Sequence, residues 1–102
     1  MRVDWSDPAL DDLDDITRYI AKGSPYYATE FAERIFSTVD RLIDFPLSGR
    51  SVPEAKNSSI REVIVQGYRI MYRVEPARVL ILAAIHSSRD LDNLAATPWE
   101  TH

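Results

Sequence analysis

The sequence contains no cysteine in its 102 residues. Disulfide bonds, thiolate nucleophiles and cysteine-bound metals are therefore excluded, and the composition is compatible with a reducing cytoplasm. Long apolar runs are also missing, because the longest, residues 79–85, is far too short to span a bilayer. The opening MRVDWSDPAL carries acidic residues where a secretory signal would be apolar. We therefore expect one soluble, cytoplasmic domain over residues 1–102, with no membrane partner.

A net positive charge is lacking as well. The formal charge of −4 argues against a general nucleic-acid binder. The charge is unevenly placed: residues 1–44 hold five basic and ten acidic side chains, whereas residues 50–89 hold seven basic and three acidic ones. Six of those seven are arginines, whose planar guanidinium suits forked recognition of carboxylate or phosphate. The chain thus has an acidic front half and an arginine-bearing middle.

Two amphipathic helices are predicted near the N-terminus. Ser6 or Asp7 supplies an N-cap for a helix from Pro8 to about Lys22. Its apolar residues recur at helical spacing on one face: Ala9, Leu13, Ile16 and Ile20. A second helix is expected over residues 25–44. The connection at residues 23–24 is so short that the two helices must form an antiparallel hairpin.

Four aspartates, Asp11, Asp12, Asp14 and Asp15, lie near the start of the first helix. Acidic residues stabilise a helix N-terminus and keep a surface soluble. A metal site is the alternative, but no sequence signal turns these carboxylates inward. We therefore predict no metal and no cofactor.

Three strands are predicted over residues 60–65, 68–75 and 78–86, and residues 1–5 form a short strand candidate. Alternation in YRIMYRV sends one set of side chains toward the helices: Tyr68, Ile70, Tyr72 and Val74. Arg69 and Arg73 then share the other face, which we expect to be open. Arg69→Ala should accordingly cost no more than about 1 kcal/mol. A further short helix is predicted over residues 90–95. The predicted fold class is α+β, an N-terminal helical hairpin packed on a small antiparallel β-sheet.

The order of the motifs resembles the RelE/ParE superfamily of toxins from type II toxin–antitoxin modules. The resemblance rests on PALDDLDDITRYIA, LIDFPLSGRSVPE, IREVIVQGYRIMYRV and IHSSRDL, and it covers nearly the whole chain. It implies one of two activities. RelE-like members are ribosome-dependent endoribonucleases that cut messenger RNA, and ParE-like members bind and poison DNA gyrase. It also implies a small antitoxin, ParD-like, encoded beside the toxin.

RNA cleavage of the RelE type needs a base, an acid and cations around one phosphate. If this chain is a metal-independent nuclease, the candidates are Glu54 as base, His86 as acid or base, and Arg61 and Arg69 as cations. Arg69 matches an arginine that the nuclease members use. The tyrosine that they tend to carry near the C-terminus is missing, since SSRDLDNL follows His86. The resemblance therefore favours a ParE-like gyrase inhibitor; the alternatives are a RelE-like nuclease and a non-toxic relative that serves only in a complex.

Binding residues are predicted on two surfaces. The target, gyrase or alternatively the ribosome with its message, is expected at Arg61, Arg69, Arg73, His86 and Arg89. The antitoxin is expected to lay a helix along the hairpin at Leu13, Tyr19, Phe31 and Arg34, and a strand on a free sheet edge. Simpler interpretations compete with these roles, because surface arginines also keep a sheet face soluble and a histidine at a strand end often serves packing.

Overall fold

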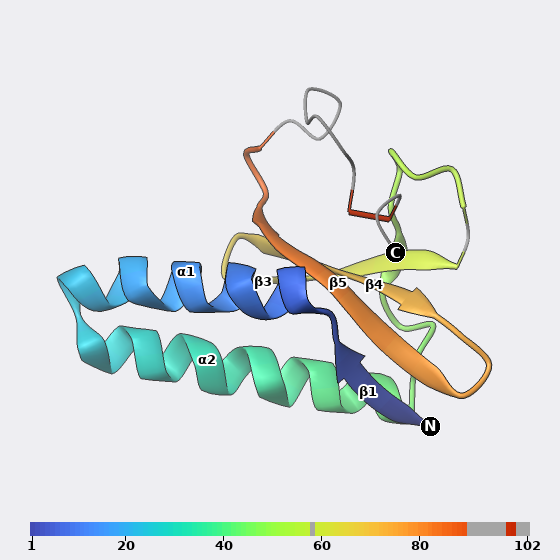
Figure 1. The fold of residues 1–102 in the computed structure, drawn as a ribbon, viewed down its shortest axis with the longest axis horizontal. Coiled ribbons are helices and arrows are strands. Elements are labelled where there is room, and N and C mark those ends of the chain that lie inside the picture. Colours follow the sequence, from blue (N-terminus) through green and yellow to red (C-terminus); the bar gives the residue numbers. More distant parts are fainter. Residues whose placement is uncertain (58, 90–97, 100–102) are drawn as a thin grey trace.

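The computed structural model describes residues 1–57, 59–89 and 98–99. The predicted helix over residues 90–95 lies outside them. The elements in chain order are β1 (Arg2–Trp5), α1 (Asp7–Gly23), α2 (Pro25–Asp40), the 3-10 turn η1 (Arg41–Ile43), β2 (Arg50–Ser51), β3 (Ile60–Val65), β4 (Tyr68–Val74) and β5 (Arg78–His86). Figure 1 shows the two helices side by side, with the strands crossing at the end of the hairpin where α1 begins and α2 ends.

The helical hairpin is confirmed, and serine caps define its two helix starts. The Ser6 hydroxyl accepts the Ala9 N–H at 3.2 Å, and the Ser24 hydroxyl accepts the Tyr27 N–H at 3.2 Å. The Ser24 N–H also donates to the carbonyl of Ile20, so one residue closes α1 and opens α2. The regular part of α2 ends at Asp40, earlier than predicted, because the chain tightens into η1. Neither described helix is long and apolar enough to cross a membrane.

The five strands form one sheet in the order β1-β5-β4-β3-β2. β2, β3, β4 and β5 pair in antiparallel fashion, but β1 runs parallel to β5. The sheet is therefore mixed, and the purely antiparallel sheet of the prediction needs this correction. The direction of β1 follows from its connection to the next element, because β1 leads directly into α1. The Ser6 N–H donates to the Ile81 carbonyl at 3.0 Å and so fixes the first turn of α1 to the sheet.

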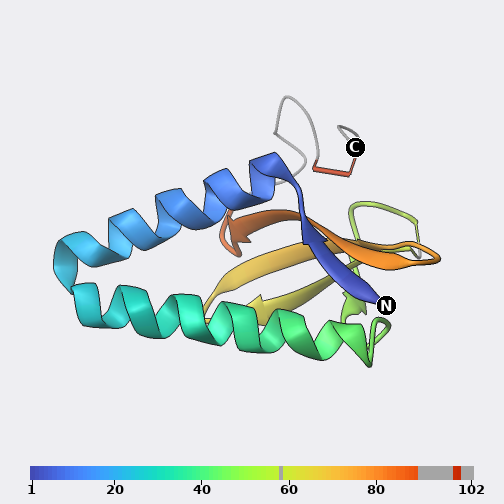
Figure 2. The same cartoon turned by 60° about the horizontal axis from the view of Figure 1, so that its bottom comes forward.

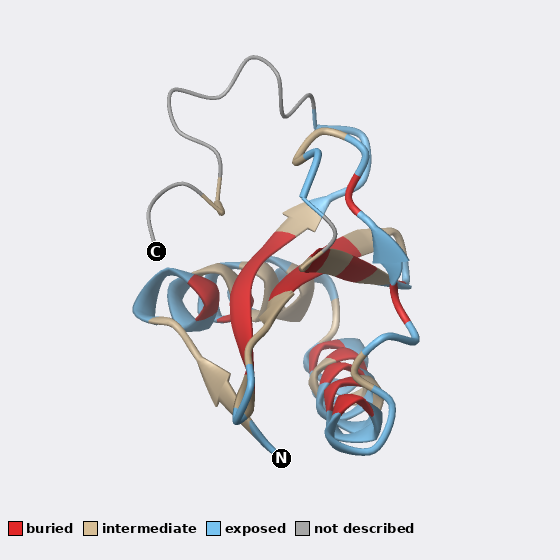
Figure 3. Ribbon diagram, turned by 90° about the vertical axis from the view of Figure 1, so that its right-hand side faces the viewer, coloured by how far each residue is buried: buried red, intermediate tan, exposed pale blue. Residues whose placement is uncertain are grey.

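The core between hairpin and sheet forms on the predicted face. Ile70 and Tyr72 are fully buried there, against Phe31 and Ile35 of α2. The two helices splay apart from their connection, and the strands lie in the opening (Figure 2). α1 packs on β5 and α2 packs on β3. Burial concentrates on β4, β5 and the inward sides of the helices (Figure 3).

The opposite face of the sheet is covered as well, so the expectation of an open face was wrong. Met71 and Leu82 are fully buried in a second cluster, together with Val52 from the segment after β2. Trp99 packs against this cluster. An irregularity in the β4–β5 pairing pairs Met71 with Ala83 but Tyr72 with Ile81, which leaves Leu82 as the extra residue. The apolar run of β5 is thus explained by two cores, one on each face.

Candidate functional site

Arg69 lies at the centre of a buried ion network on the second face. Its side chain is 7% exposed. Its Nη1 and Nη2 donate to the two carboxylate oxygens of Glu54 at 3.0 and 2.8 Å, and its Nε donates to Glu62 Oε1 at 2.6 Å. Glu62, whose side chain is fully buried, also accepts from the Nε of Arg50 at 2.6 Å. The segment after β2 therefore closes over Arg69 and neutralises it.

This arrangement changes the chemistry open to Glu54 and Arg69. Hydrogen bonds from Arg69 hold the pKa of Glu54 below its ordinary value, and the same contact raises the pKa of Arg69. A general base needs a pKa near the working pH, which Glu54 in this pairing lacks. The expectation that Arg69 is exposed on an open face is wrong, because Glu54 and Glu62 occupy its guanidinium, and its role in target binding stays a prediction.

Arg61 is also engaged, on the hairpin side of the sheet. Its Nη1 donates to the carbonyls of Gly49 at 2.8 Å and Leu47 at 3.3 Å. The Tyr72 hydroxyl donates to the Pro46 carbonyl at 2.8 Å and accepts the Gly49 N–H at 3.0 Å. Burial raises the pKa of Tyr72, so the hydroxyl stays protonated and keeps its donor role. Arg61 and Tyr72 together hold residues 46–49 against the sheet.

His86 ends β5 and is exposed. Its ring stands edge-on to Tyr68, with the ring centres 5.2 Å apart, and its Nδ1 lies 2.6 Å from the Ser88 hydroxyl. Because Nδ1 also accepts the Ser88 N–H at 3.2 Å, the neutral ring carries its proton on Nε2. Arg89 follows as an exposed residue, and Arg73 is bound to Glu75 at 2.9 Å. The structure therefore distributes the predicted cations over several surfaces and does not gather them around one phosphate-sized site.

One of the four N-terminal aspartates does turn inward, contrary to the sequence-based interpretation. Asp12 accepts the backbone N–H of Ala84 at 3.0 Å, next to the irregularity in β5. Desolvation by burial raises the pKa of Asp12. No group of three or more histidine, aspartate or glutamate side chains among the described residues could hold a metal ion. Asp12 acts as a link between α1 and the sheet.

The residues predicted to bind an antitoxin fall into two classes. Tyr19 and Arg34 are exposed on the hairpin. Leu13 and Phe31 are 8% and 1% exposed and lie in the core between hairpin and sheet. Helical spacing alone identified their apolar face, and that face is occupied by the sheet. Leu13 and Phe31 are therefore packing residues in the folded chain.

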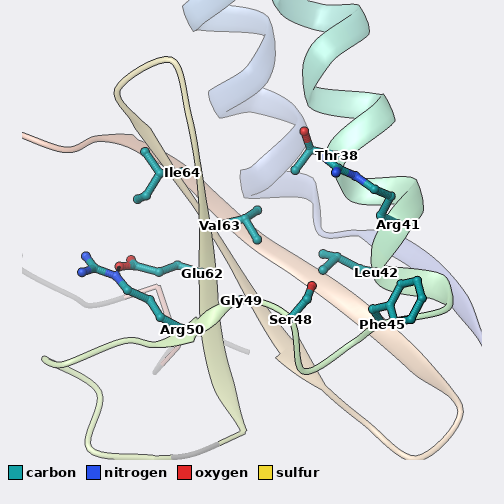
Figure 4. Close-up of a pocket in the computed structure, with 10 residues that line it drawn as sticks. All are labelled: Thr38, Arg41, Leu42, Phe45, Ser48, Gly49, Arg50, Glu62, Val63 and Ile64. Atoms are coloured by element: carbon teal, nitrogen blue, oxygen red, sulfur yellow. Dashed lines mark hydrogen bonds and ion pairs between the residues drawn. The ribbon is translucent and has the colours of Figure 1, made fainter.

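A groove runs between the end of α2, the segment after η1 and β3. Its larger part, a cavity of about 610 Å³, is lined by Thr38, Arg41, Leu42, Phe45, Ser48, Gly49, Arg50, Glu62, Val63 and Ile64. Figure 4 shows Leu42 and Val63 pointing toward each other across this cavity, while Arg50 reaches to Glu62. A second cavity of about 370 Å³ adds Arg34, Ser37, Val65 and Gln66. The sequence did not reveal the groove, because its walls come from α2, the segment after η1 and β3. Helical or strand periodicity shows which residues of one element share a face, but not which separate elements lie side by side.

Comparisons with known proteins agree with the fold and the motifs. Residues 3–91 match the family described as ParE toxin of type II toxin-antitoxin system, parDE. The chain is 36% identical over 88 residues to Y4kP of Sinorhizobium fredii, covering 84% of this chain and 88% of that protein. It is 35% identical over 89 residues to toxin RelE2 of Caulobacter vibrioides, covering 86% and 97%. A solved structure of the chromosomal ParDE system from P. aeruginosa shares the fold, with a TM-score of 0.69 at 22% identity, covering 84% of this chain and 95% of that one.

Proposed function

Because the chain belongs to the ParE toxin family of type II toxin–antitoxin systems, we propose that it is a toxin that inhibits DNA gyrase by protein–protein binding. The observation that carries this proposal is the state of Arg69. The resemblance implies that nucleases of the alternative type use the arginine at this strand position as a cation. Here Glu54 and Glu62 hold its guanidinium with three hydrogen bonds, and its side chain is 7% exposed. Inhibition by binding needs no free cation at that position.

The second candidate is a ribosome-dependent endoribonuclease. One observation favours it: the His86 ring is exposed and has its Nε2 directed away from the Ser88 contact, so it can exchange a proton with a bound substrate. The similarity to toxin RelE2 does not separate the two activities, because residues 3–91 also match the ParE toxin family.

The partner in this proposal is an antitoxin whose flexible C-terminal segment folds on the toxin. Exposed aromatic and charged side chains near the hairpin connection, Tyr19, Tyr26 and Tyr27 among them, offer contact area to an amphipathic helix. Such an antitoxin neutralises the toxin by covering its target-binding surface, and the toxin stays folded. The proposed compartment is the cytoplasm, where gyrase and the ribosome both lie.

Two assays on the purified protein test the target. Supercoiling by gyrase is measured with increasing toxin, and cleavage of a message is measured on translating ribosomes. The proposal expects loss of supercoiling and an intact message, and addition of the antitoxin in equal amount should restore supercoiling. Cleavage of the message with unaffected supercoiling would reverse the order of the two candidates.

A further inference from the structure

The turn after β5 places a serine hydroxyl on a histidine ring. The Ser88 Oγ lies 2.6 Å from Nδ1 of His86, and the Ser88 N–H donates to the same nitrogen at 3.2 Å. A backbone N–H can only donate, so Nδ1 of the neutral ring must be an acceptor. The hydroxyl of Ser88 is therefore the donor in the shorter contact. This is the arrangement of a nucleophile and its general base.

The His86 ring is oriented by a side chain that is anchored in the core. Tyr68 lies directly opposite His86 in the β4–β5 pairing, and the two rings meet edge-on with their centres 5.2 Å apart. Tyr68 also contacts the ring of Phe31, with the centres 5.3 Å apart, and Phe31 is buried. Because the core fixes Tyr68, Tyr68 restrains the ring of His86. A nucleophile–base pair needs such a third group to orient its base.

Backbone hydrogen bonds hold the serine side of the pair. The Ser87 N–H donates to the Gly67 carbonyl at 2.8 Å, and the Arg89 N–H donates to the His86 carbonyl at 3.0 Å. Gly67 belongs to the tight turn between β3 and β4, where its φ of 85° suits glycine. Residues 86–89 are thereby fixed to the neighbouring turn, and the Ser88 hydroxyl is presented from a defined backbone.

The pair is open to solvent. Residues 86–89 are all exposed, and none of them lines either cavity of the groove beside α2 and β3. A donor is therefore selected here by the reactivity of the group that it transfers, and less by its shape. Arg89 is an exposed cation next to Ser88, and it can approach the negative charge that develops when a carbonyl is attacked. An activated ester or thioester meets these requirements, because its carbonyl reacts with a hydroxyl whose proton a base removes.

We propose that Ser88 and His86 form a nucleophile–base pair through which the protein becomes acylated by activated esters and thioesters. The Ser88 Oγ attacks the carbonyl carbon while its proton passes to Nδ1 of His86. The new Oγ–C bond forms, the bond from carbon to the leaving oxygen or sulfur breaks, and the leaving group takes the proton from Nδ1. The product is an acyl ester on Ser88 beside a neutral imidazole. The acyl group lies at the end of β5, next to two residues predicted to bind a target, His86 and Arg89.

The probe is p-nitrophenyl acetate, and wild type is compared with Ser88→Ala, Ser87→Ala and His86→Asn. The reaction is followed by release of p-nitrophenolate and by intact mass after acid quenching, and peptide mapping locates the acetyl group. Ser87→Ala is the matched control, because it removes the neighbouring exposed hydroxyl but keeps the amide that binds Gly67. His86→Asn offers an oxygen to the Ser88 hydrogens but no base.

Wild type should carry one acetyl group, on Ser88, and Ser87→Ala should react at the wild-type rate. Ser88→Ala should carry no acetyl group on this turn. His86→Asn should slow acetylation of Ser88 by about 100-fold or more, as expected for the loss of a general base. All three substitutions lie at exposed positions, and circular dichroism should show the wild-type spectrum for each.

Four results would overturn the proposal. They are no stable acetyl group on wild type, an acetyl group on Ser87 or an exposed tyrosine in place of Ser88, equal rates for wild type and His86→Asn, and full release of p-nitrophenolate by Ser88→Ala. The last result would make the His86 ring itself the nucleophile. If His86→Asn were unfolded, the comparison of Ser88→Ala with Ser87→Ala would still decide the site. The assay contains no gyrase, so acylation of Ser88 and inhibition of gyrase are tested independently.

Discussion

Replacing Arg69 by alanine should destabilise the protein strongly, in contrast to what its place in the sequence pattern predicts. The side chain is 7% exposed and donates three hydrogen bonds to Glu54 and Glu62. Without it, the fully buried carboxylate of Glu62 keeps only Arg50 as a cation. Truncation of one partner leaves an uncompensated buried charge, which is the costly case for ion pairs.

The magnitude follows from the burial of the partners. Breaking a buried pair costs about 3–5 kcal/mol. The lower end, about 3 kcal/mol, applies because Arg50 still binds Glu62 and because the Glu54 side chain, 26% exposed, can rehydrate. For a domain of this size, each kcal/mol lowers Tm by about 4–8 °C, so a loss of roughly 12 °C or more is expected.

Urea unfolding followed by circular dichroism at neutral pH measures this change. Arg18→Ala is the control, since Arg18 forms an exposed ion pair with Asp14 at 2.8 Å and should change stability by less than about 0.5 kcal/mol. The double substitution Arg69→Met with Glu62→Leu should recover much of the loss, because an apolar pair leaves no buried charge. If Arg69→Ala unfolds within about 1 kcal/mol of wild type, the buried network does not exist in solution and the arginine face is open.

Three further predictions concern single side chains. His86→Ala should leave stability within about 0.5 kcal/mol, because the ring is exposed, and should leave gyrase inhibition intact, whereas a nuclease that uses this ring would slow by about 100-fold or more. Tyr72→Phe removes the acceptor of the Gly49 N–H and should cost about 1–3 kcal/mol in urea unfolding, with faster exchange of the Gly49 amide; an unchanged amide would show that the hydroxyl does not hold this segment. Asp12→Asn keeps an oxygen for the Ala84 N–H but removes a charge whose pKa burial raises. Because the pKa of Asp12 is raised in the folded state, protonation of Asp12 stabilises the folded wild type as the pH falls through that pKa. At pH 7 the variant should therefore have the larger free energy of unfolding, and this difference from wild type should shrink on acidification. A constant or growing difference would contradict this reasoning.

Much of the architecture is present in local sequence patterns. Helical spacing in both N-terminal segments predicted the hairpin, and of the two expected N-cap residues, Ser6 and Asp7, the structure shows Ser6 in that role. Alternation around Tyr68, Ile70 and Tyr72 predicted which side of β4 meets the hairpin. These signals succeed because a helix or strand repeats its facing every few residues, so neighbours in sequence report which side avoids water.

Only the tertiary structure decided the rest, because the deciding contacts join distant residues. Arg69 reads as an exposed cation from its neighbours, yet Glu62 and Glu54, seven and fifteen positions away, bury and neutralise it. Alternation assigned it to the face opposite the hairpin but could not show that the chain after β2 covers that face. The parallel pairing of β1 arises in the same way. Periodicity determines which side chains share a face; what covers that face depends on where the chain returns, and that is a property of the whole fold.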